Sequence, residues 1–426
     1  MPRFSALLFF SCFLSPLFSA DVLYIKTGRL IADPGQPSIA QAAIVITDGI
    51  VTAAGPGLAV PSGARQIDLS NYTVLPSILD AHCHLWTGGL LQTPSPAYAA
   101  LKAAQSVGYA VQSGVSALRV LGSTDFIDVA MRDAIEDGTI PGPHVIPAAH
   151  ALTIPGGHGD RMTLPYSIPF ADLYTPLHGF VSSPADAERA VQMQIKFGAR
   201  VIKLAASGGV GSPLDWPSDE HLSPEEMRVA IEQAHMHHLK VAAHAENLKT
   251  ILDAVAAGVD SIEHGSELNS EAIDSMKRHG TILVPTLNVV DTFQTFGERQ
   301  HLPEIMMMKA RNLAKSHFAS FQLALKNGMT MAAGSDTFYS PGGTTVLDEL
   351  VTEVKYGMSP KQALQTGTTE AAKLLGLEKL GRIAPGMEAD LIAVEGDPLN
   401  DIHALERVRF VLYKGAVMKD RLNSMK

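Results

Sequence analysis

The chain has 426 residues, of which 46% are hydrophobic and 18% are charged, and its formal net charge is −10. This length accommodates two or three average domains, or one large α/β barrel with a small appendage. The apolar content excludes a disordered or fibrous chain, and an acidic balance without a block of Lys and Arg argues against a nucleic-acid partner. The two cysteines, Cys12 and Cys83, supply neither a disulfide framework nor a cysteine-based zinc site.

The first twenty residues differ in character from the rest of the chain. Arg3 precedes an apolar run that extends to Phe18, and the segment ends in the small residues Ser19 and Ala20. This pattern predicts a secretory signal peptide over residues 1–20, and therefore a secreted or periplasmic protein. The alternative is a buried N-terminal strand or an anchor. The run is too short to span a bilayer, and no later stretch is longer, so we expect no membrane partner after cleavage.

Both ends of the remaining chain are rich in short strand-like runs. Near the N-terminus these are Val22–Ile25, Ile44–Ile46 and Ile50–Thr52, and near the C-terminus they are Asp390–Val394 and Val408–Leu412. Turn-forming pairs such as Asp48-Gly49 separate neighbouring runs. We therefore predict a small accessory β-sandwich formed by residues 21–73 and 381–426.

The middle of the chain, residues 74–380, alternates between strand-like runs and helix-compatible segments. The eight runs are Val74–Ala81, Val115–Leu121, His144–Leu152, Val201–Ala206, Val241–Ala245, Ser261–His264, Thr281–Thr286 and Met329–Ala333. Among the helix candidates are Pro184–Phe197, Pro224–His237, Leu248–Ala257 and Pro303–Lys326. This alternation indicates an α/β fold with a (β/α)8 TIM barrel, which has about 250 residues. A doubly wound open sheet is the alternative, but no glycine-rich dinucleotide loop supports it.

Several of these runs end in side chains that bind metals. The first run ends in His82 and His84, whose side chains point the same way along an extended strand. Later runs end in His244, His264 and Asp336. The carboxyl ends of barrel strands meet at one mouth, where active sites form, and imidazoles and carboxylates are ligands of zinc and similar ions. The sequence therefore predicts a metal centre at this mouth.

Taken singly, each of these side chains would be interpreted as an ordinary buried polar residue. A second His-x-His pair, His235 and His237, lies at the end of a helix candidate, where residues two apart face different directions. We interpret that pair as a solvated helix end.

Lys203 stands between Ile202 and Leu204 in the fourth run. Burial of an ammonium group at such a position is costly. The side chain therefore either extends its charged end to solvent, or it is a neutral amine that has combined with CO₂ to form a carbamate. The carbamate would carry a negative charge and two oxygens able to bridge two cations, and the surrounding histidines favour this N6-carboxylated form.

These residues and their order resemble the amidohydrolase superfamily. Its opening metal motif is matched by Leu75–His84, and its later ligands are matched in order by Lys203, His244, His264 and Asp336. Segments 156–160, 203–209 and 333–338 resemble one branch of that superfamily. The branch holds imidazolonepropionase-related and Xaa-Pro dipeptidase-like enzymes, including ochratoxin-hydrolysing amidases. The resemblance extends over nearly the whole mature chain, because the β-rich ends are similar to the accessory sandwich of the family.

The resemblance implies a binuclear centre with two divalent metal ions, zinc being the first expectation. One ion would be held by His82, His84 and Asp336, the other by His244 and His264, with carbamylated Lys203 and a hydroxide bridging them. The hydroxide would attack the amide carbon, and Asp336 would transfer its proton to the departing amine.

Three further residues are candidates for substrate contacts. His158, on a glycine-rich loop, either donates to the developing oxyanion or orders the loop. Arg161 and Tyr166 are weaker candidates for binding a substrate carboxylate. The pair Arg119-Val120 and the segment Ala245–Asn247 depart from the pattern of the branch at expected pocket positions, so they affect substrate choice rather than metal binding.

We therefore predict a secreted, binuclear metal-dependent amidohydrolase that cleaves amide bonds of dipeptides or N-acyl amino acids, including ochratoxin-type amides. A lactonase or phosphotriesterase-like hydrolase on the same centre is one alternative, and a non-catalytic binding protein that keeps the barrel is another. His and carboxylate ligands suit zinc, cobalt, manganese and iron to different degrees. A homo-oligomer is expected by analogy with the family.

Overall fold

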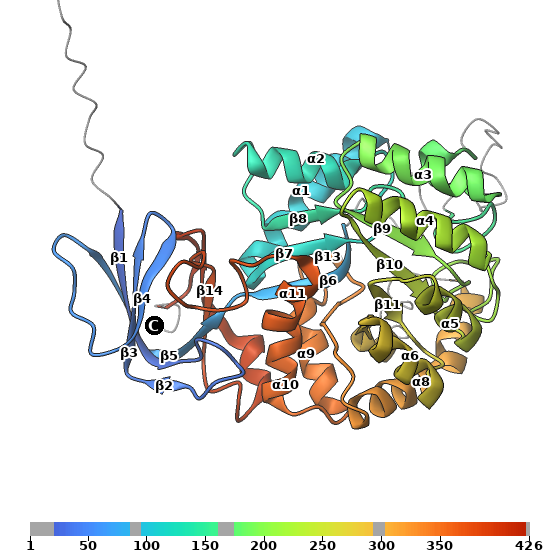
Figure 1. Cartoon of the computed structure of the whole chain (residues 1–426). Coiled ribbons are helices and arrows are strands. Elements are labelled where there is room, and N and C mark those ends of the chain that lie inside the picture. The colour runs from blue at the N-terminus through green and yellow to red at the C-terminus, as the bar shows by residue number, and fades with distance from the viewer. Residues whose placement is uncertain (1–20, 86–94, 161–173, 293–302, 423–426) are drawn as a thin grey trace, which may run out of the picture.

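The computed structural model describes residues 21–85, 95–160, 174–292 and 303–422. The predicted signal peptide, Cys12, Arg161 and Tyr166 lie outside the described residues. Among the described helices, none combines the length and apolar character needed to cross a bilayer. Figure 1 shows a β-rich part made from the two chain ends beside a larger part in which helices surround strands.

Strands from both chain ends form one sheet. They are β1 (Val22–Leu30), β2 (Ile39–Ala40), β3 (Ala42–Thr47), β4 (Ile50–Pro56), β5 (Arg65–Pro76), β14 (Leu391–Val394), β15 (Val408–Tyr413) and β16 (Ala416–Asp420). Their order is β16-β15-β14-β5-β1-β3-β4, with β2 paired to β1. The antiparallel pair of β5 and β14 joins the two chain ends, as the sequence predicts. One sheet does not by itself establish the two layers of the predicted sandwich.

The central part contains two four-stranded parallel sheets, β13-β6-β7-β8 and β12-β11-β10-β9. The strands are β6 (Ile78–Leu85), β7 (Val115–Val120), β8 (His144–Pro147), β9 (Val201–Ala205), β10 (Lys240–Ala245), β11 (Ser261–His264), β12 (Ile282–Val284) and β13 (Phe338–Tyr339). Segments outside these strands connect the two sheets. The N–H of Leu152, after β8, donates to Lys203 O on β9 at 2.8 Å, and the N–H of Ala81 on β6 donates at 2.9 Å to the O of Ala333, in the segment that bridges to β12.

Two predicted strands need correction. The run Val74–Ala81 is divided at Ser77, whose N–H donates to Asp390 O at the point where the chain leaves the terminal sheet. The run Met329–Ala333 is not a regular strand. It pairs with β12 through an isolated bridge between Leu283 and Met331, because its remaining backbone bonds go to segments on both sides rather than to one ladder.

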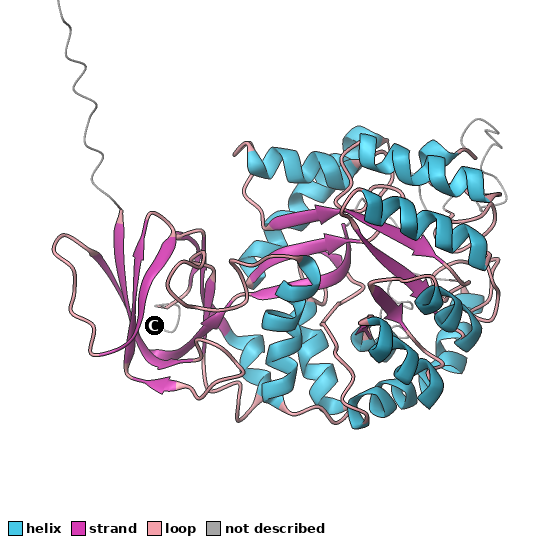
Figure 2. Cartoon of the chain, in the orientation of Figure 1, coloured by secondary structure: helices cyan, strands magenta, loops and turns pink. Residues whose placement is uncertain are grey.

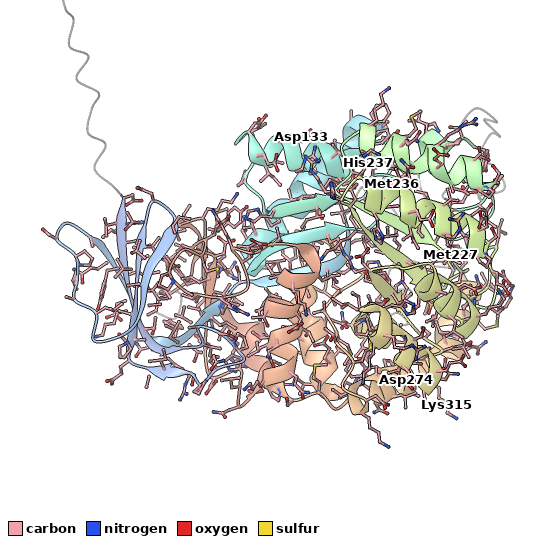
Figure 3. All side chains as sticks on the ribbon, viewed as in Figure 1. Asp133, Met227, Met236, His237, Asp274 and Lys315 are labelled. Atoms are coloured by element: carbon pink, nitrogen blue, oxygen red, sulfur yellow. The ribbon has the colours of Figure 1, made fainter. Side chains whose placement is uncertain are left out.

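Helices cover the outside of the central strands (Figure 2). They are α1 (Pro96–Ser113), α2 (Ile127–Glu136), α3 (Pro184–Lys196), α4 (Pro224–Met236), α5 (Leu248–Ala256), α6 (Ser270–His279), α8 (Glu304–Lys326), α9 (Val346–Lys355), α10 (Pro360–Gln365) and α11 (Ala371–Leu375). The N-terminus of α4 shows why prediction succeeded: Ser223 and Glu226 form a capping box before the first turn. His235 and His237 are exposed at the other end of α4, where Figure 3 labels Met236 and His237, so the predicted solvated helix end is confirmed.

Candidate metal centre

The first group of metal-binding side chains combines β6 with the segment before β13. His82 and His84 lie two residues apart on β6, and the backbone N–H of Asp336 donates to His82 O at 2.7 Å. The Oδ1 atom of Asp336 lies 3.1 Å from His84 Nε2 and 3.4 Å from His82 Nε2. The structure thus brings the three predicted ligands together around one point.

The second group lies at the ends of β10 and β11. Donor atoms of His244, Glu246 and His264 lie within 4.8 Å of one another. The ring centroids of His244 and His264 are 4.6 Å apart, and that of His264 is 5.1 Å from the ring of His82. The two groups are therefore adjacent, as two neighbouring cations would require.

Lys203, on β9, is 5% exposed, so its side chain does not extend freely to solvent. Burial lowers its pKa to about 8, although the negative charges of Glu263 and Asp336 favour the charged form. The positive charge of Lys203 in turn contributes to lowering the pKa of His82. A buried lysine with a lowered pKa, close to the metal-binding side chains, fits the neutral amine that carbamate formation needs.

Glu263 fixes the orientation of His82. Its Oε2 atom lies 2.8 Å from His82 Nδ1, so this ring nitrogen carries the proton and Nε2 faces Asp336 as a free acceptor. Arg119 donates to Glu263 Oε1 at 2.8 Å. Burial favours the protonated form of Glu263, but the charge of Arg119 and the bond to His82 outweigh burial and hold the pKa at about 2. Burial also lowers the pKa of His82 to about 4, which keeps this imidazole neutral.

The two histidines of the second group are oriented in the same manner. His264 Nδ1 lies 2.7 Å from Thr286 Oγ1, and His244 Nε2 donates to Gly208 O at 3.0 Å. The Nδ1 atom of His244 is buried and has no partner among the described residues. Burial lowers the pKa of both histidines well below the ordinary value. A neutral imidazole with one ring nitrogen free is the form that binds a metal, so these residues fit the ion that the motif implies.

Three residues of the site have positive φ angles, which residues other than glycine rarely adopt. The φ angles are 70° at His264, 53° at Thr286 and 48° at Asp336. Such angles are unfavourable for residues with a Cβ, above all for the β-branched Thr286. Strain of about 1–3 kcal/mol per residue is retained at functional sites, where it places a side chain that a relaxed backbone would not.

His158 contacts the second group directly. Its ring stacks on that of His244 with centroids 4.0 Å apart, and its Nδ1 atom lies 2.8 Å from Ser212 Oγ. The side chain is 23% exposed, so it faces the mouth rather than the core. The contact with Ser212 orders a loop, and the stacking places the ring at the centre, so both interpretations of this residue have structural support.

Sequence reasoning missed several residues that support the site. Glu263, Thr286 and Lys309 carry no motif of their own, although Lys309 lies on the buried face of α8 between Met306 and Leu313. In the structure Lys309 is 2% exposed, and its amine donates to Ser212 O at 2.7 Å and to Asp215 O. Lys309 therefore holds the loop that carries the partner of His158. No local signal in the sequence indicates this long-range contact.

Glu246 belongs to a segment that departs from the branch pattern, and the sequence does not predict its place beside the histidines. Its carboxyl group accepts a hydrogen bond from Ser266, and burial raises its pKa to about 8. Ser266 also lies 2.8 Å from His317 Nδ1. Glu246 thus adds a buried acid to the second group.

Comparison with known proteins identifies the family of the chain. Residues 73–418 match the model of the amidohydrolase family. The chain is 33% identical over 418 residues to an ochratoxinase of Aspergillus niger, covering 92% of this chain and 85% of the relative. The crystal structure of A. niger ochratoxinase superposes with a TM-score of 0.83 at 30% identity, over 94% of this chain and 96% of the other.

Two further solved structures are similar over nearly their whole length. A Xaa-Pro dipeptidase with bound methionine in its active site has a TM-score of 0.85 at 31% identity, covering 93% of this chain and 99% of the other. A prolidase complexed with N-methylphosphonate-L-proline has a TM-score of 0.86 at 27% identity, covering 94% of this chain and 100% of the other. The resemblance inferred from the strand-end motifs is thereby confirmed.

Proposed function

The chain belongs to the amidohydrolase family, and from this premise we propose that it hydrolyses amide bonds of N-acyl amino acids or dipeptides at a binuclear metal centre. The names of its relatives, an ochratoxinase and a Xaa-Pro dipeptidase, support an amide or peptide substrate. The observation that carries the proposal is the adjacency of two donor groups with a buried lysine beside them. A closed TIM barrel with a β-sandwich, export by the signal peptide and a homo-oligomeric state are parts of the same proposal.

The donors divide naturally between two cations. His82, His84 and Asp336 would hold one, and His244, through its free Nδ1, would hold the other together with His264. Lys203 in its carbamate form would supply oxygens to both. Bound divalent cations lower the pKa of water and polarise a carbonyl oxygen, which is the chemistry that amide hydrolysis needs. The mixed imidazole and carboxylate set suits zinc first.

Asp336 is the residue best placed to move a proton. Although its burial favours the protonated form, the neighbouring His82 and the hydrogen bond to His84 hold the pKa of Asp336 well below the ordinary value, so its carboxylate is ready to accept a proton. A carboxylate at this position takes a proton from the attacking water and gives it to the departing amine. His158, stacked on His244 at the mouth, is placed to donate to the oxygen that becomes negative.

The decisive experiment is a screen of purified protein against N-acyl amino acids and dipeptides, each paired with the matched ester or lactone. The protein is stripped with a chelator and then assayed with and without added Zn²⁺, Co²⁺ or Mn²⁺. We expect amide hydrolysis that disappears with the metal and returns when the metal is restored. Faster turnover of the lactones or of a phosphotriester would favour the alternative hydrolase, and a protein that binds no metal and hydrolyses nothing would overturn the proposal.

A further inference from the structure

A third group of metal-binding side chains lies away from the candidate centre. His144 is the first residue of β8, and Glu388 and Asp390 lie just before β14. Their donor atoms all lie within 4.8 Å of one another, and His144 Nε2 is 3.0 Å from Glu388 Oε2. Because β8 begins at His144, this group lies at the opposite end of the parallel strands from His82 and Asp336. Figure 1 shows β14 on the side of the terminal sheet that faces the central part.

Two buried oxygen atoms in this group lack a partner among the described residues. They are Asp390 Oδ2 and the hydroxyl of Tyr413. Asp390 is 5% exposed and Tyr413 is 8% exposed, and the ring of Tyr413 packs edge-on against that of His144 at 5.6 Å. A buried polar atom left without a partner costs about 1–3 kcal/mol. Two buried oxygens therefore remain without a partner, one on Asp390 and one on Tyr413, whose ring packs against His144.

An ion pair between His144 and Glu388 does not account for this arrangement. Such a pair uses one carboxylate, and the Oδ1 atom of Asp390 is already occupied by the N–H of Lys414 at 2.7 Å, so Oδ2 still lacks a partner. The charges of the exposed Lys379 and Lys414 act on Glu388. Neither lysine forms a hydrogen bond to the unpartnered oxygens among the described residues. A second positive charge shared by both carboxylates would satisfy the whole group.

We propose that His144, Glu388 and Asp390 bind a divalent cation of the zinc or manganese class, with the Tyr413 hydroxyl beside it. One imidazole and two carboxylates form a donor set for such ions, and a shared ion would draw the donors to about 3–3.5 Å from one another. The side chains of His144 and Glu388 are 23% and 22% exposed, so an ion can enter from solvent. The bound cation fastens the start of β8 to the terminal sheet and has no part in hydrolysis.

The test removes the strand-end centre first, so that its ions are not counted. In a His82→Ala, His84→Ala, His244→Ala variant we expect equilibrium dialysis against Zn²⁺ or Mn²⁺ to retain about one cation per chain. Adding Asp390→Asn or His144→Gln lowers the affinity at least tenfold, because each change removes a ligand. The matched control is His235→Gln, which removes an exposed histidine paired with Asp260 at 2.9 Å and leaves the affinity unchanged.

Two further measurements make the outcome unambiguous. Co²⁺ added to the same background should give a visible absorption band that His144→Gln shifts and His235→Gln does not. Zn²⁺ should raise the Tm of the background, and this rise should vanish with Asp390→Asn. Should Asp390→Asn unfold, His144→Gln and Tyr413→Phe are measured in its place. A background variant that retains no cation, or one whose binding none of these changes weakens, overturns the proposal without bearing on hydrolysis.

Discussion

Two groups of carboxyls in the central part of the molecule are held in opposite charge states. At the strand ends, the pKa values of Glu263 and Asp336 are held low because the charge of Arg119 beside Glu263, and the hydrogen bonds of the two carboxylates to histidines, outweigh burial. On α9, Glu349 and Glu353 are fully buried, and burial raises the pKa of both. Glu349 accepts hydrogen bonds from the N–H groups of Leu287 and Asn288 at 2.7 and 2.6 Å, yet these neutral donors do not offset burial.

The charge state of a buried carboxyl depends on whether an opposite charge is buried with it. Removing a carboxyl from water makes it a neutral acid, whereas removing it together with an opposite charge keeps it a carboxylate. Ionised carboxylates and neutral imidazoles are the forms that bind divalent cations, and the strand ends hold both. The acids of α9 instead have raised pKa values, which favour the protonated form.

Lys203→Ala carries the largest expected effect. If the carbamate connects the two cations, its loss should lower kcat/KM by about 10³-fold or more, because several kcal/mol of transition-state stabilisation depend on the paired ions. Small carboxylic acids such as acetate should restore part of the activity by replacing the bridge. The matched control is Lys240→Ala on the neighbouring strand, whose amine donates to Lys373 O and Leu374 O away from the site. Full activity of Lys203→Ala would remove the carbamate from the mechanism.

His158→Ala should lower kcat by about 10²–10³-fold with little change in KM, since an oxyanion donor acts mainly in the transition state. Ser212→Ala tests the competing role, because it removes the loop contact and leaves the imidazole in place. A loss in Ser212→Ala equal to that in His158→Ala would show that the histidine orders the loop instead. Steady-state kinetics on one amide substrate distinguishes the two results.

Arg119→Met should raise the pKa of Glu263 toward the raised values of Glu349 and Glu353 on α9. Without the guanidinium group, burial is opposed by less positive charge, so the pKa of Glu263 rises and its hold on His82 weakens. Loss of such a supporting contact typically costs 10–100-fold in metal affinity, which competition with a chelator measures. Arg228→Met is the control, since Arg228 pairs with exposed Glu225 and Glu232 on α4. Unchanged metal affinity in Arg119→Met would mean that His82 needs no such support.

The strand-end donors were predictable because a local pattern specifies them. Each follows an apolar run, and parallel strands carry their ends to one edge, so His82, His244 and His264 were assigned from position alone. Arg119 and Thr286 meet those donors only in the folded chain, and no spacing in the sequence indicates that contact. The end of the first strand run was also not predictable, because it depends on a contact that forms only in the folded chain. The division of the first run at Ser77 depends on a bond to Asp390, which is more than 300 residues away in sequence.

Glu353→Gln should have the smallest effect on activity and should act on stability instead. Its Oε2 atom accepts a hydrogen bond from Thr366 at 2.6 Å, which a glutamine oxygen preserves, while the ionisable proton is lost. Since the folded-state pKa of Glu353 is raised, its contribution to stability is complete below the ordinary pKa and is lost as pH rises through the raised value. The contribution of Glu353 should therefore fall above about pH 5, and Glu353→Gln, which lacks this loss, should gain about 1–2 kcal/mol at pH 8 relative to the wild type. Urea unfolding of the metal-free protein at pH 5 and pH 8 measures this, with exposed Glu378→Gln as the control. Equal pH dependence in Glu353→Gln and the wild type would show that Glu353 is ionised in the folded chain, and the contrast with Glu263 would fail.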